Sequence, residues 1–368
     1  MNSSVNLNDL GWDDEREHEF TSYAEHIAGR ARPDRKPKLV PGRVAVEHRG
    51  GYSLLTMQGE VWAESTGRMR HEALSRADLP ATGDWVAAEL HDDGHASVHA
   101  VLPRRTRFSR NIAGKATDEQ VLAANIDVSF LVASLEIEVN LRKLERYLTL
   151  AWSGGTDPVV VLTKSDLAGD PEDLVYEMRR VESVALGVPV LLTSAETKAG
   201  VEDVRDQLAG NRTAVLLGSS GAGKSTLVNA MTGTADQDVR SARGDGKGRH
   251  TTTRRELIAL EGGGALVDTP GLRGLKLWDH GDGMAGSFAD VDELASACRF
   301  RDCRHDGEPG CAIRAAIESG ELAQVRLDDY NKLQRELDYQ RSKQDQRYAM
   351  ERKREWKAIH TSLRKTSW

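Results

Sequence analysis

The sequence predicts an α/β protein in three main parts: a five-stranded, OB-like β-barrel, a parallel sheet covered by helices, and a small helical domain. Three observations predict this order. Short alternating apolar runs separated by turns occupy residues 42–102, longer apolar runs separated by helical segments occupy 126–274, and the cysteines fall together after residue 297. Alternation with a period of two indicates half-buried strands, whereas strands that alternate with helices indicate a parallel sheet.

Composition fits a globular protein of 368 residues, long enough for two or three domains, with 39% hydrophobic and 29% charged residues. No apolar run reaches the roughly 20 residues of a membrane span. The N-terminus MNSSVNLNDLGWDDEREHEF is acidic and lacks a signal-peptide layout, so we expect a cytoplasmic protein without a membrane partner. Three cysteines crowded into one segment argue against disulfides and for a metal site.

Residues 1–40 are polar, and we expect them to form an extension or a partly ordered arm. The barrel should follow over residues 41–112. Its five expected strands are RVAVEH, YSLLTM, EVWAES, DWVAAEL and ASVHAVL, and the turn signals between them are RGG, QGE, TGD and DDG. Five strands suit an OB-fold.

Five cations follow the barrel at positions 104, 105, 107, 110 and 115. They indicate either an RNA-binding rim or a charged interdomain linker.

A nucleotide-binding domain is expected over residues 113–275. Its buried strands are predicted in IDVSFLVAS, DPVVVLTKSD, GVPVLLTSAE, TAVLLGSS and GGALVDTPG, with helices in NLRKLERYLTLAW and PEDLVYEMRRVESVALG. Such runs are typical of a parallel sheet that is buried on both faces.

The stretch AVLLGSSGAGKSTLVNA, residues 214–230, reads as a strand, a glycine-rich loop and a helix start. Gly218, Gly223, Lys224 and Ser225 fill the pattern G-x-x-x-x-G-K-[ST], whose backbone N–H groups cradle phosphates. Lys224 would reach the β- and γ-phosphates, and Ser225 would hold magnesium. The predicted phosphate-binding residues are Gly218, Ser219, Ser220, Gly221, Ala222, Gly223, Lys224, Ser225 and Thr226.

Two downstream segments complete the predicted magnesium site. Asp268 ends the strand of VDTPG and would hold the ion through water, while the N–H of Gly271 would meet the γ-phosphate. The loop GKGRHTTTRRE, residues 246–256, carries three threonines, one of which should complete the magnesium shell. We assign Thr252, although the residues alone do not distinguish it from Thr251 or Thr253.

The base-reading segments come before the phosphate loop. Asp166 of TKSD offers two acceptor oxygens that match the N1–H and N2–H donors of guanine and not adenine, and the Lys164 stem would lie along the base. The N–H of Ala195 in TSAE could meet guanine O6. The predicted base-contacting residues are Thr163, Lys164, Ser165, Asp166, Ser194 and Ala195. Alternatively, Asp166 only caps a helix.

The motif order TKSD, TSAE, GSSGAGKS, HTTT, DTPG is that of a circularly permuted P-loop GTPase. Cys298-x4-Cys303-x-His305-x5-Cys311 offers three thiolates and one imidazole, which suit one structural, tetrahedral zinc in a domain over residues 276–330. Reduced cysteines without an ion, or a redox switch, are the alternatives.

Over about residues 40 to 340 the sequence closely resembles the circularly permuted, ribosome small-subunit-dependent GTPases of the RsgA family. The resemblance rests on GDWV at 83–86, the permuted motif order, GRHTTT at 248–253 and CRFRDCRHDGEPGCAI at 298–313. It implies an OB-fold, a GTPase core with magnesium, and a C-terminal zinc domain. It also implies a role in late maturation of the small ribosomal subunit, with hydrolysis stimulated by that subunit. Expected partners are GTP and GDP, the subunit and its rRNA, and no DNA; we expect a monomer.

Leu272 occupies the position after DxxG, where many GTPases use a glutamine to orient the attacking water. Slow hydrolysis is therefore expected until another group acts. His250 is the candidate within the chain, a role that the resemblance supports. Its alternative role is to stabilise the loop.

Residues 331–368 form a tail with eleven Lys/Arg and five Asp/Glu, a local charge of +6 in a chain of net charge −7. Such a helical tail suits rRNA contact or is a solvated helix.

Two rival functions are an ATP-dependent phosphotransferase and a non-enzymatic RNA-binding scaffold. Asp166 and TSAE count against the first, and Leu272 leaves the second open.

Overall fold

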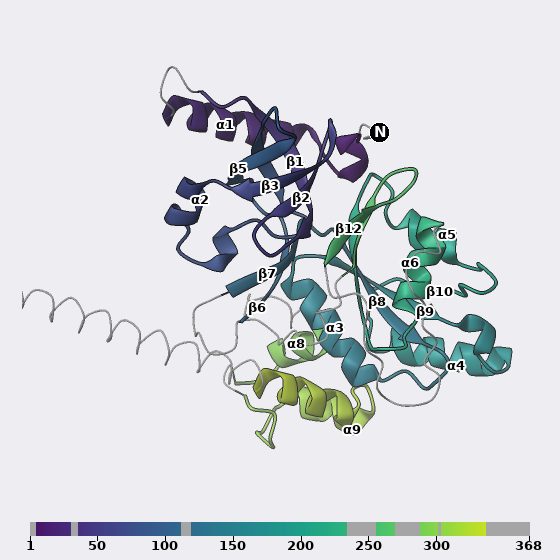
Figure 1. Ribbon diagram of the computed structural model, residues 1–368. Helices are drawn as coiled ribbons and strands as arrows, with labels where there is room; N and C mark the ends of the chain where they lie inside the picture. The colour runs from purple at the N-terminus through teal and green to yellow at the C-terminus, as the bar shows by residue number, and fades with distance from the viewer. Residues whose placement is uncertain are drawn as a thin grey trace, which may run out of the picture.

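Figure 1 shows the fold of this protein as a computed structural model that describes residues 5–30, 36–111, 119–233, 255–268, 288–300 and 303–335. Eleven strands form one continuous sheet in the order β10-β9-β8-β11-β13-β12-β1-β2-β3-β5-β4. The first six of these strands belong to the nucleotide-binding part and the last five to the barrel. The two parts therefore share backbone pairing rather than only side-chain contacts.

The barrel closes because β1 pairs with both β2 and β4, while β3 runs parallel to β5. Alternate residues of its strands, including Val44, Leu54, Val86 and Val98, fill the interior without exposure. The strands are β1 (Leu39–Glu47), β2 (Tyr52–Thr56), β3 (Gly59–Ser65), β4 (Trp85–Leu90) and β5 (His95–Val101). Short helices α2 (Gly67–Glu72) and η2 (Arg76–Asp78) lie between β3 and β4. The predicted five-stranded barrel is confirmed.

The nucleotide-binding sheet is parallel except at β12, which runs antiparallel to β13. Its strands are β8 (Val128–Ser134), β9 (Asp157–Thr163), β10 (Val190–Leu192), β11 (Thr213–Gly218), β12 (Glu256–Ala259) and β13 (Ala265–Asp268). Five of these strands were predicted from the sequence, whereas β12 was not, because its first residue falls within the predicted threonine loop.

Helices cover both faces of this sheet because strand residues alternate between two cores. One face packs on α3 (Leu141–Ser153) and α4 (Pro171–Glu182), and the other on α5 (Val201–Asp206) and α6 (Lys224–Thr232). Local signals set the helix starts. The Asn140 side chain accepts from the Lys143 N–H at the start of α3, and Asp170 with Pro171 begins α4.

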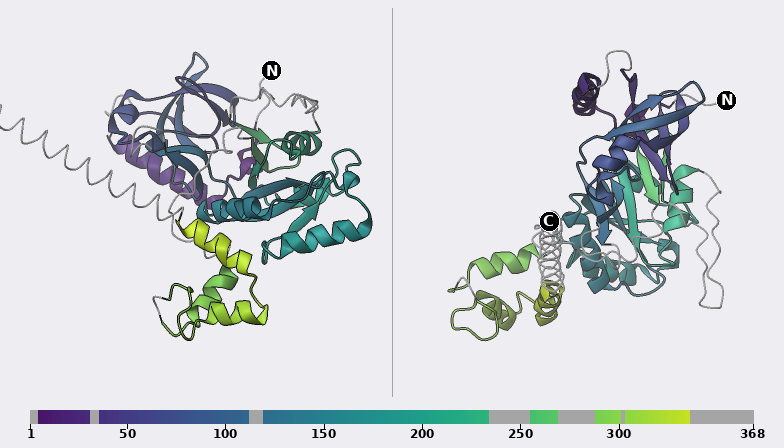
Figure 2. Two further views of the ribbon diagram at one scale, coloured as in Figure 1. Left: turned by 90° about the horizontal axis from the view of Figure 1, so that it is seen from below. Right: turned by 60° about the vertical axis from the view of Figure 1, so that its left-hand side comes forward.

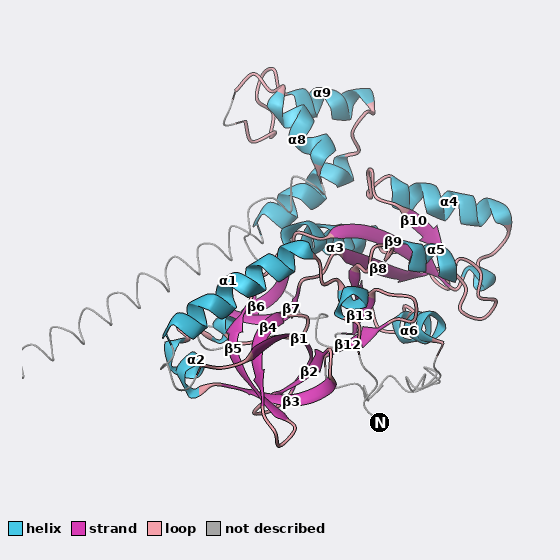
Figure 3. Ribbon diagram, turned by 90° about the horizontal axis from the view of Figure 1, so that it is seen from above, coloured by secondary structure: helices cyan, strands magenta, loops and turns pink. Residues whose placement is uncertain are grey.

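The described part of the predicted N-terminal extension, residues 5–30, is mostly helical, and the sequence did not predict these helices. It contains η1 (Leu7–Leu10) and α1 (Asp14–Arg30), and α1 lies along the barrel (Figure 3). Trp12 packs edge-on against Trp85 of β4 with ring centroids 4.8 Å apart. Arg16 is 1% exposed and donates to the Asn125 side chain at 2.7 Å. The many acidic residues of α1 concealed the buried pair Arg16 and Phe20, which are one helical turn apart.

A two-stranded antiparallel sheet of β6 (Arg107–Asn111) and β7 (Glu119–Ala124) follows the barrel and was not predicted. The preceding arginines serve the fold. Arg104 forms a two-pronged bond to Asp84, a buried residue of GDWV, at 2.8 and 2.7 Å, and Arg105 pairs with Asp13. Burial raises the pKa of Asp84, and the hydrogen bonds and positive charge of Arg104 partly counteract this rise.

Arg107 also pairs internally, with Glu119 at 3.5 Å. These pairs favour the linker interpretation over an RNA-binding rim at positions 104, 105 and 107. Lys115 and the Arg110 side chain lie outside the described part of the chain.

The C-terminal part stands to one side of the sheet (Figure 2) and contains α8 (Ala289–Ser296), α9 (Ala312–Ser319) and a helix over residues 324–335. Arg326 joins it to α3, because its buried guanidinium bonds Glu145 of α3 and, at 3.0 Å, both carboxylate oxygens of Asp290. Most of the basic tail lies outside the described residues, and the domain boundaries remain predictions. Among the described helices, none is long and apolar enough to cross a membrane.

Candidate nucleotide and metal sites

The phosphate loop follows β11 and runs into α6, as the motif predicts. Gly218 pairs with Val132 in the sheet, and a Cβ on Gly218 would lie 2.4 Å from the Val132 carbonyl oxygen, so only glycine fits. Gly221 and Gly223 have φ of 79° and 87°, in the left-handed region that glycine tolerates. The loop from Gly218 to Gly223 also carries Ser219, Ser220 and Ala222, and Ser225 and Thr226 follow Lys224 in the first turn of α6.

The Lys224 ammonium folds over this loop. It donates to the carbonyl oxygens of Gly218 at 3.0 Å and Ser219 at 2.6 Å. Together with the N-terminus of the nine-residue helix α6, this cation makes the loop an attractive position for anionic phosphate.

The predicted base-reading strand is tied directly to the phosphate loop. Thr163, the last residue of β9, donates its hydroxyl to the Ala222 carbonyl oxygen at 2.7 Å. The same hydroxyl lies 3.1 Å from the place where a Cβ of Gly223 would stand. TKSD and GSSGAGKS are 59 residues apart at this contact, and the hydrogen bond fixes their separation in space.

The two predicted base loops are also joined to each other. The Ser165 N–H donates to the Thr193 carbonyl at 3.1 Å, and the Thr193 N–H donates to the Leu162 carbonyl at 2.8 Å. Ser194 is 1% exposed and its hydroxyl accepts from the Thr197 N–H at 3.1 Å, which orders the turn that carries Ala195. Thr193 was not predicted as a site residue, and its only signal in the sequence is its place directly after the apolar run that forms β10.

Lys164 and Asp166 lie at the edge of this arrangement. Lys164 has φ of 59° and its ammonium pairs with Glu136, which follows β8. Asp166 is exposed in the short helix η3 (Ser165–Leu167), which has no side-chain cap. The helix that follows is capped by Asp170 instead, so the alternative that Asp166 is a helix cap is wrong.

Asp268 ends β13, next to β11 in the sheet, and so lies at the edge that carries the phosphate loop. Three predicted site residues lie outside the described part of the chain: Gly271, Thr252 and His250.

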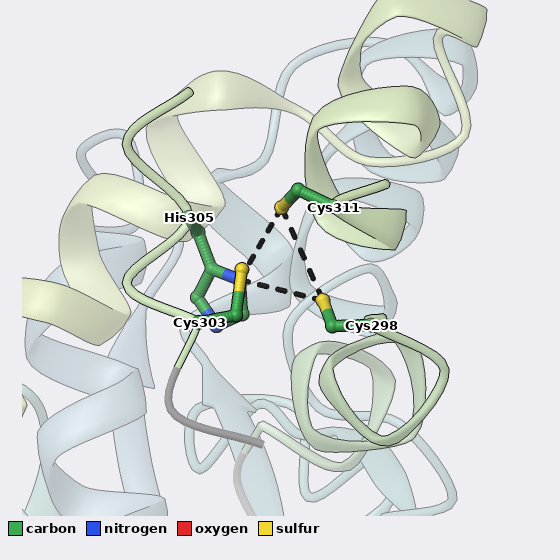
Figure 4. Close-up of side chains that lie close together, drawn as sticks. All are labelled: Cys298, Cys303, His305 and Cys311. Carbon is green, nitrogen blue, oxygen red and sulfur yellow. Dashed lines mark hydrogen bonds between the residues drawn. The ribbon is translucent and has the colours of Figure 1, made fainter. Parts of the chain in front are cut away.

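Three cysteines and one histidine form a compact cluster between α8 and α9 (Figure 4). The four ligand atoms of Cys298, Cys303, His305 and Cys311 all lie within 4.8 Å of one another. His305 Nδ1 lies 3.6 Å from the Cys298 sulfur and 3.4 Å from the Cys311 sulfur, and these two sulfurs are 4.0 Å apart.

A tetrahedral zinc with Zn–S bonds of about 2.3 Å requires S···S separations of about 3.8 Å and slightly shorter N···S separations. The three distances among Cys298, His305 and Cys311 therefore fit zinc, and Cys303 completes the cluster within 4.8 Å. The Cys311 sulfur also accepts from the Arg314 N–H at 3.4 Å, an outer bond that suits a thiolate ligand.

Comparison with known proteins gives consistent results. The family model described as RsgA GTPase matches residues 101–278. The small ribosomal subunit biogenesis GTPase RsgA of Streptomyces coelicolor is 46% identical, with 95% of this chain and 92% of the relative covered. That of Opitutus terrae is 44% identical, over 98% of this chain and 97% of the relative. The chain belongs to the RsgA GTPase family.

Solved structures agree with this membership. YjeQ from Thermotoga maritima is 28% identical, covers 81% of this chain and 98% of its own, and superimposes with a TM-score of 0.62. YloQ, a circularly permuted GTPase, is 23% identical over 86% of this chain and 99% of its own, with a TM-score of 0.58. As a member of the RsgA family, the chain is a GTP hydrolase with the permuted fold that the motif order predicted.

Proposed function

We propose that this GTPase binds the small ribosomal subunit and assists its late maturation, hydrolysing GTP slowly alone and faster on the subunit. The subunit role rests on the names of the curated relatives at 44–46% identity over most of the chain. The observation in the structure that carries the nucleotide assignment is the Thr163 hydroxyl bond to Ala222, because it joins a base-reading segment to a phosphate loop.

Guanine specificity would come from Asp166. Its exposed carboxylate lies beyond the carboxyl end of β9, where it can accept from N1–H and N2–H of the base. Adenine has no matching donor pair, so an adenine nucleotide would leave this carboxylate unpaired. Lys164 would lie against the base plane, with Glu136 holding its ammonium. Ser194 and Ala195 would complete the pocket, the latter through its N–H to guanine O6.

The phosphates would lie on the N–H groups from Gly218 to Thr226, with Lys224 turned from the loop carbonyls to the β- and γ-phosphates. Magnesium fits the donor set of Ser225, Asp268 and Thr252, all oxygen ligands that this ion prefers. The ion would neutralise charge on the phosphates. The N–H of Gly271 would meet the γ-phosphate.

Hydrolysis would depend on a water that Leu272 cannot orient, and His250 is our candidate for that task. In a His250→Ala protein we expect normal GTP affinity and a loss of at least about tenfold in the subunit-stimulated rate. An unchanged stimulated rate would leave His250 with only a loop-stabilising role.

One zinc ion held by Cys298, Cys303, His305 and Cys311 would be structural. All four predicted ligands come from a segment with few buried apolar residues, so the ion would supply stability that packing does not. The donor set leaves no open position for catalysis.

The remaining partners follow from the same role. We expect contact with rRNA, through the basic tail 331–368 among other surfaces, no DNA partner, a cytoplasmic location and a monomer.

Measuring GTP turnover with and without purified small subunits tests the proposal. Stimulation on the subunit supports it, while a chain that binds GTP but never turns it over on subunits would be the RNA-binding scaffold of the rival hypothesis. A competition titration of bound GTP with ATP separates the phosphotransferase, because ATP should not displace GTP at equal concentration.

A further inference from the structure

In the shared sheet, one row of residues paired side by side across neighbouring strands connects the barrel to the nucleotide site. Glu256, the first residue of β12, pairs with Asp268 on one side and with Val46 of barrel strand β1 on the other. Neighbouring Cα atoms in such a row are about 5 Å apart, so the proposed magnesium residue lies only about 10 Å from the barrel backbone.

The next row carries a charge pair between the two parts. The register that places Val46 opposite Glu256 places Glu47 opposite Arg255, and their side chains pair at 3.3 Å. Both side chains are largely withdrawn from water, at 20% and 17% exposure. Opposite charges facing each other across antiparallel strands stabilise the pairing of those strands.

Glu47 holds a second cation within the barrel. Its other carboxylate oxygen bonds Arg76 of η2 at 2.9 Å, so one carboxylate is shared between a barrel arginine and an arginine of the nucleotide-binding part. Pairing of β1 with β2 is irregular between Val44 and Val46, next to the point where β12 joins. Such an irregularity bends the strand and changes its direction locally.

The far end of the β12–β13 hairpin is tied to the N-terminal half as well. The Gly264 N–H donates to the Asp9 carbonyl oxygen at 2.8 Å. Because the hairpin is held at both ends, a shift of the barrel relative to the nucleotide-binding sheet would be passed to β12 and β13. Arg255 and Glu256 are the last two residues of the predicted threonine loop, and Asp268 ends β13.

From this geometry we propose that Glu47 is a positioning residue for hydrolysis, through which contact of the barrel with a large partner reaches the γ-phosphate side of the site. This inference rests on the proposed function, since the partner is the small ribosomal subunit. Glu47 is not among the residues proposed to bind nucleotide or metal. It acts on Arg255, and its own place at the end of barrel strand β1 couples that effect to the barrel.

The test compares the stimulation ratio, which is the GTP hydrolysis rate on purified small subunits divided by the rate alone. We expect Glu47→Gln and Arg255→Gln each to lower this ratio about fivefold, which corresponds to about 1 kcal/mol of lost coupling. The double variant should be no worse than either single variant, because the two residues act as one unit. Subunit affinity and thermal unfolding are measured alongside, so that lost binding or unfolding is recognised.

Two controls come from the same barrel. Glu64→Gln breaks the exposed Glu64–Arg70 pair of the barrel at 3.3 Å, and Arg76→Gln removes only the partner of Glu47 within the barrel. Glu64→Gln should keep the wild-type ratio, and Arg76→Gln should lower it by no more than about twofold, because Arg76 is half exposed.

The possible results separate the inference from the proposed function. A folded Glu47→Gln or Arg255→Gln protein with the wild-type ratio overturns the inference alone, and so does an equal loss in Glu64→Gln. A wild-type protein that subunits do not stimulate would remove the proposed function and the inference together.

Discussion

Replacing Arg326 tests what holds the C-terminal part against the nucleotide-binding domain. The Arg326 side chain is 7% exposed and bonds Glu145, which is 5% exposed, as well as Asp290, which is 26% exposed. The guanidinium also lies 4.3 Å from the ring centroid of Phe288. Arg326→Leu keeps the apolar contact with this ring but leaves the Glu145 carboxylate buried without its cation.

The expected cost comes mainly from Glu145. Removing one partner of a buried ion pair costs about 3–5 kcal/mol, whereas replacing both partners with apolar residues is often close to neutral. Asp290 adds little, because it can hydrate. We therefore expect Arg326→Leu to lower the free energy of unfolding by about 3 kcal/mol or more, and Glu145→Leu/Arg326→Leu to recover most of that loss.

The pH dependence gives a second readout. Burial raises the pKa of Glu145, and Arg326 opposes this rise, so the pKa should rise further in Arg326→Leu. A group with a raised pKa in the folded state favours folding at low pH and loses that contribution as pH rises through the folded pKa. The defect of Arg326→Leu should therefore be smaller at pH 5 than at pH 8, and the double variant should lack this dependence.

Urea denaturation followed by circular dichroism measures these free energies, with the slope compared between variants. Arg142→Leu is the matched control, because Arg142 pairs with Asp329 at 2.9 Å in the same interface but is 62% exposed. It should cost less than about 1 kcal/mol. Equal losses in the single and double Arg326 variants would refute the reasoning, since the unpaired carboxylate would then not be the cause.

Three further predictions concern the sites themselves. Gly218→Ala should abolish nucleotide binding in a fluorescent-GDP titration, because its Cβ would meet the Val132 carbonyl at 2.4 Å; wild-type affinity would show that the loop relaxes. Asp166→Asn should favour xanthine over guanine nucleotides by about tenfold or more in competition titrations, since an amide can donate to the xanthine 2-oxygen; retained guanine preference would mean that another group reads the base. Elemental analysis should find one zinc per chain, and Cys311→Ser should lose it together with helical circular dichroism; full zinc retention would contradict the assigned ligand set.

Several features were predictable because their signals are local. The strand before GSSGAGKS and the helix after it follow from apolar runs and glycine positions, and the five barrel strands follow from alternation and turns. The order TKSD before GSSGAGKS is readable directly from the chain, and the permuted fold confirms it. The Cys298–Cys311 spacing likewise predicted the compact cluster that the structure contains.

Other features depended on residues that are remote in sequence. Within the N-terminal extension, Asp14–Arg30 form a helix whose Arg16 bonds Asn125, 109 residues away, and the acidic composition did not reveal this contact. For Arg104 and Arg105 the sequence left an RNA-binding rim and a charged linker as alternatives, and only the fold pairs them with Asp84 and Asp13.

The sequence by itself determined the motifs of this protein, because a phosphate-loop pattern, a predicted base-reading carboxylate and four predicted metal ligands each fall within a short segment. Only the tertiary structure decided how the parts act on one another. Glu47 and Arg255 are 208 residues apart, and Glu145 and Arg326 are 181 apart. Such pairs form only after strand register and helix packing have brought the two side chains together. The residues next to a charged side chain in the sequence do not indicate which distant residue it will pair with.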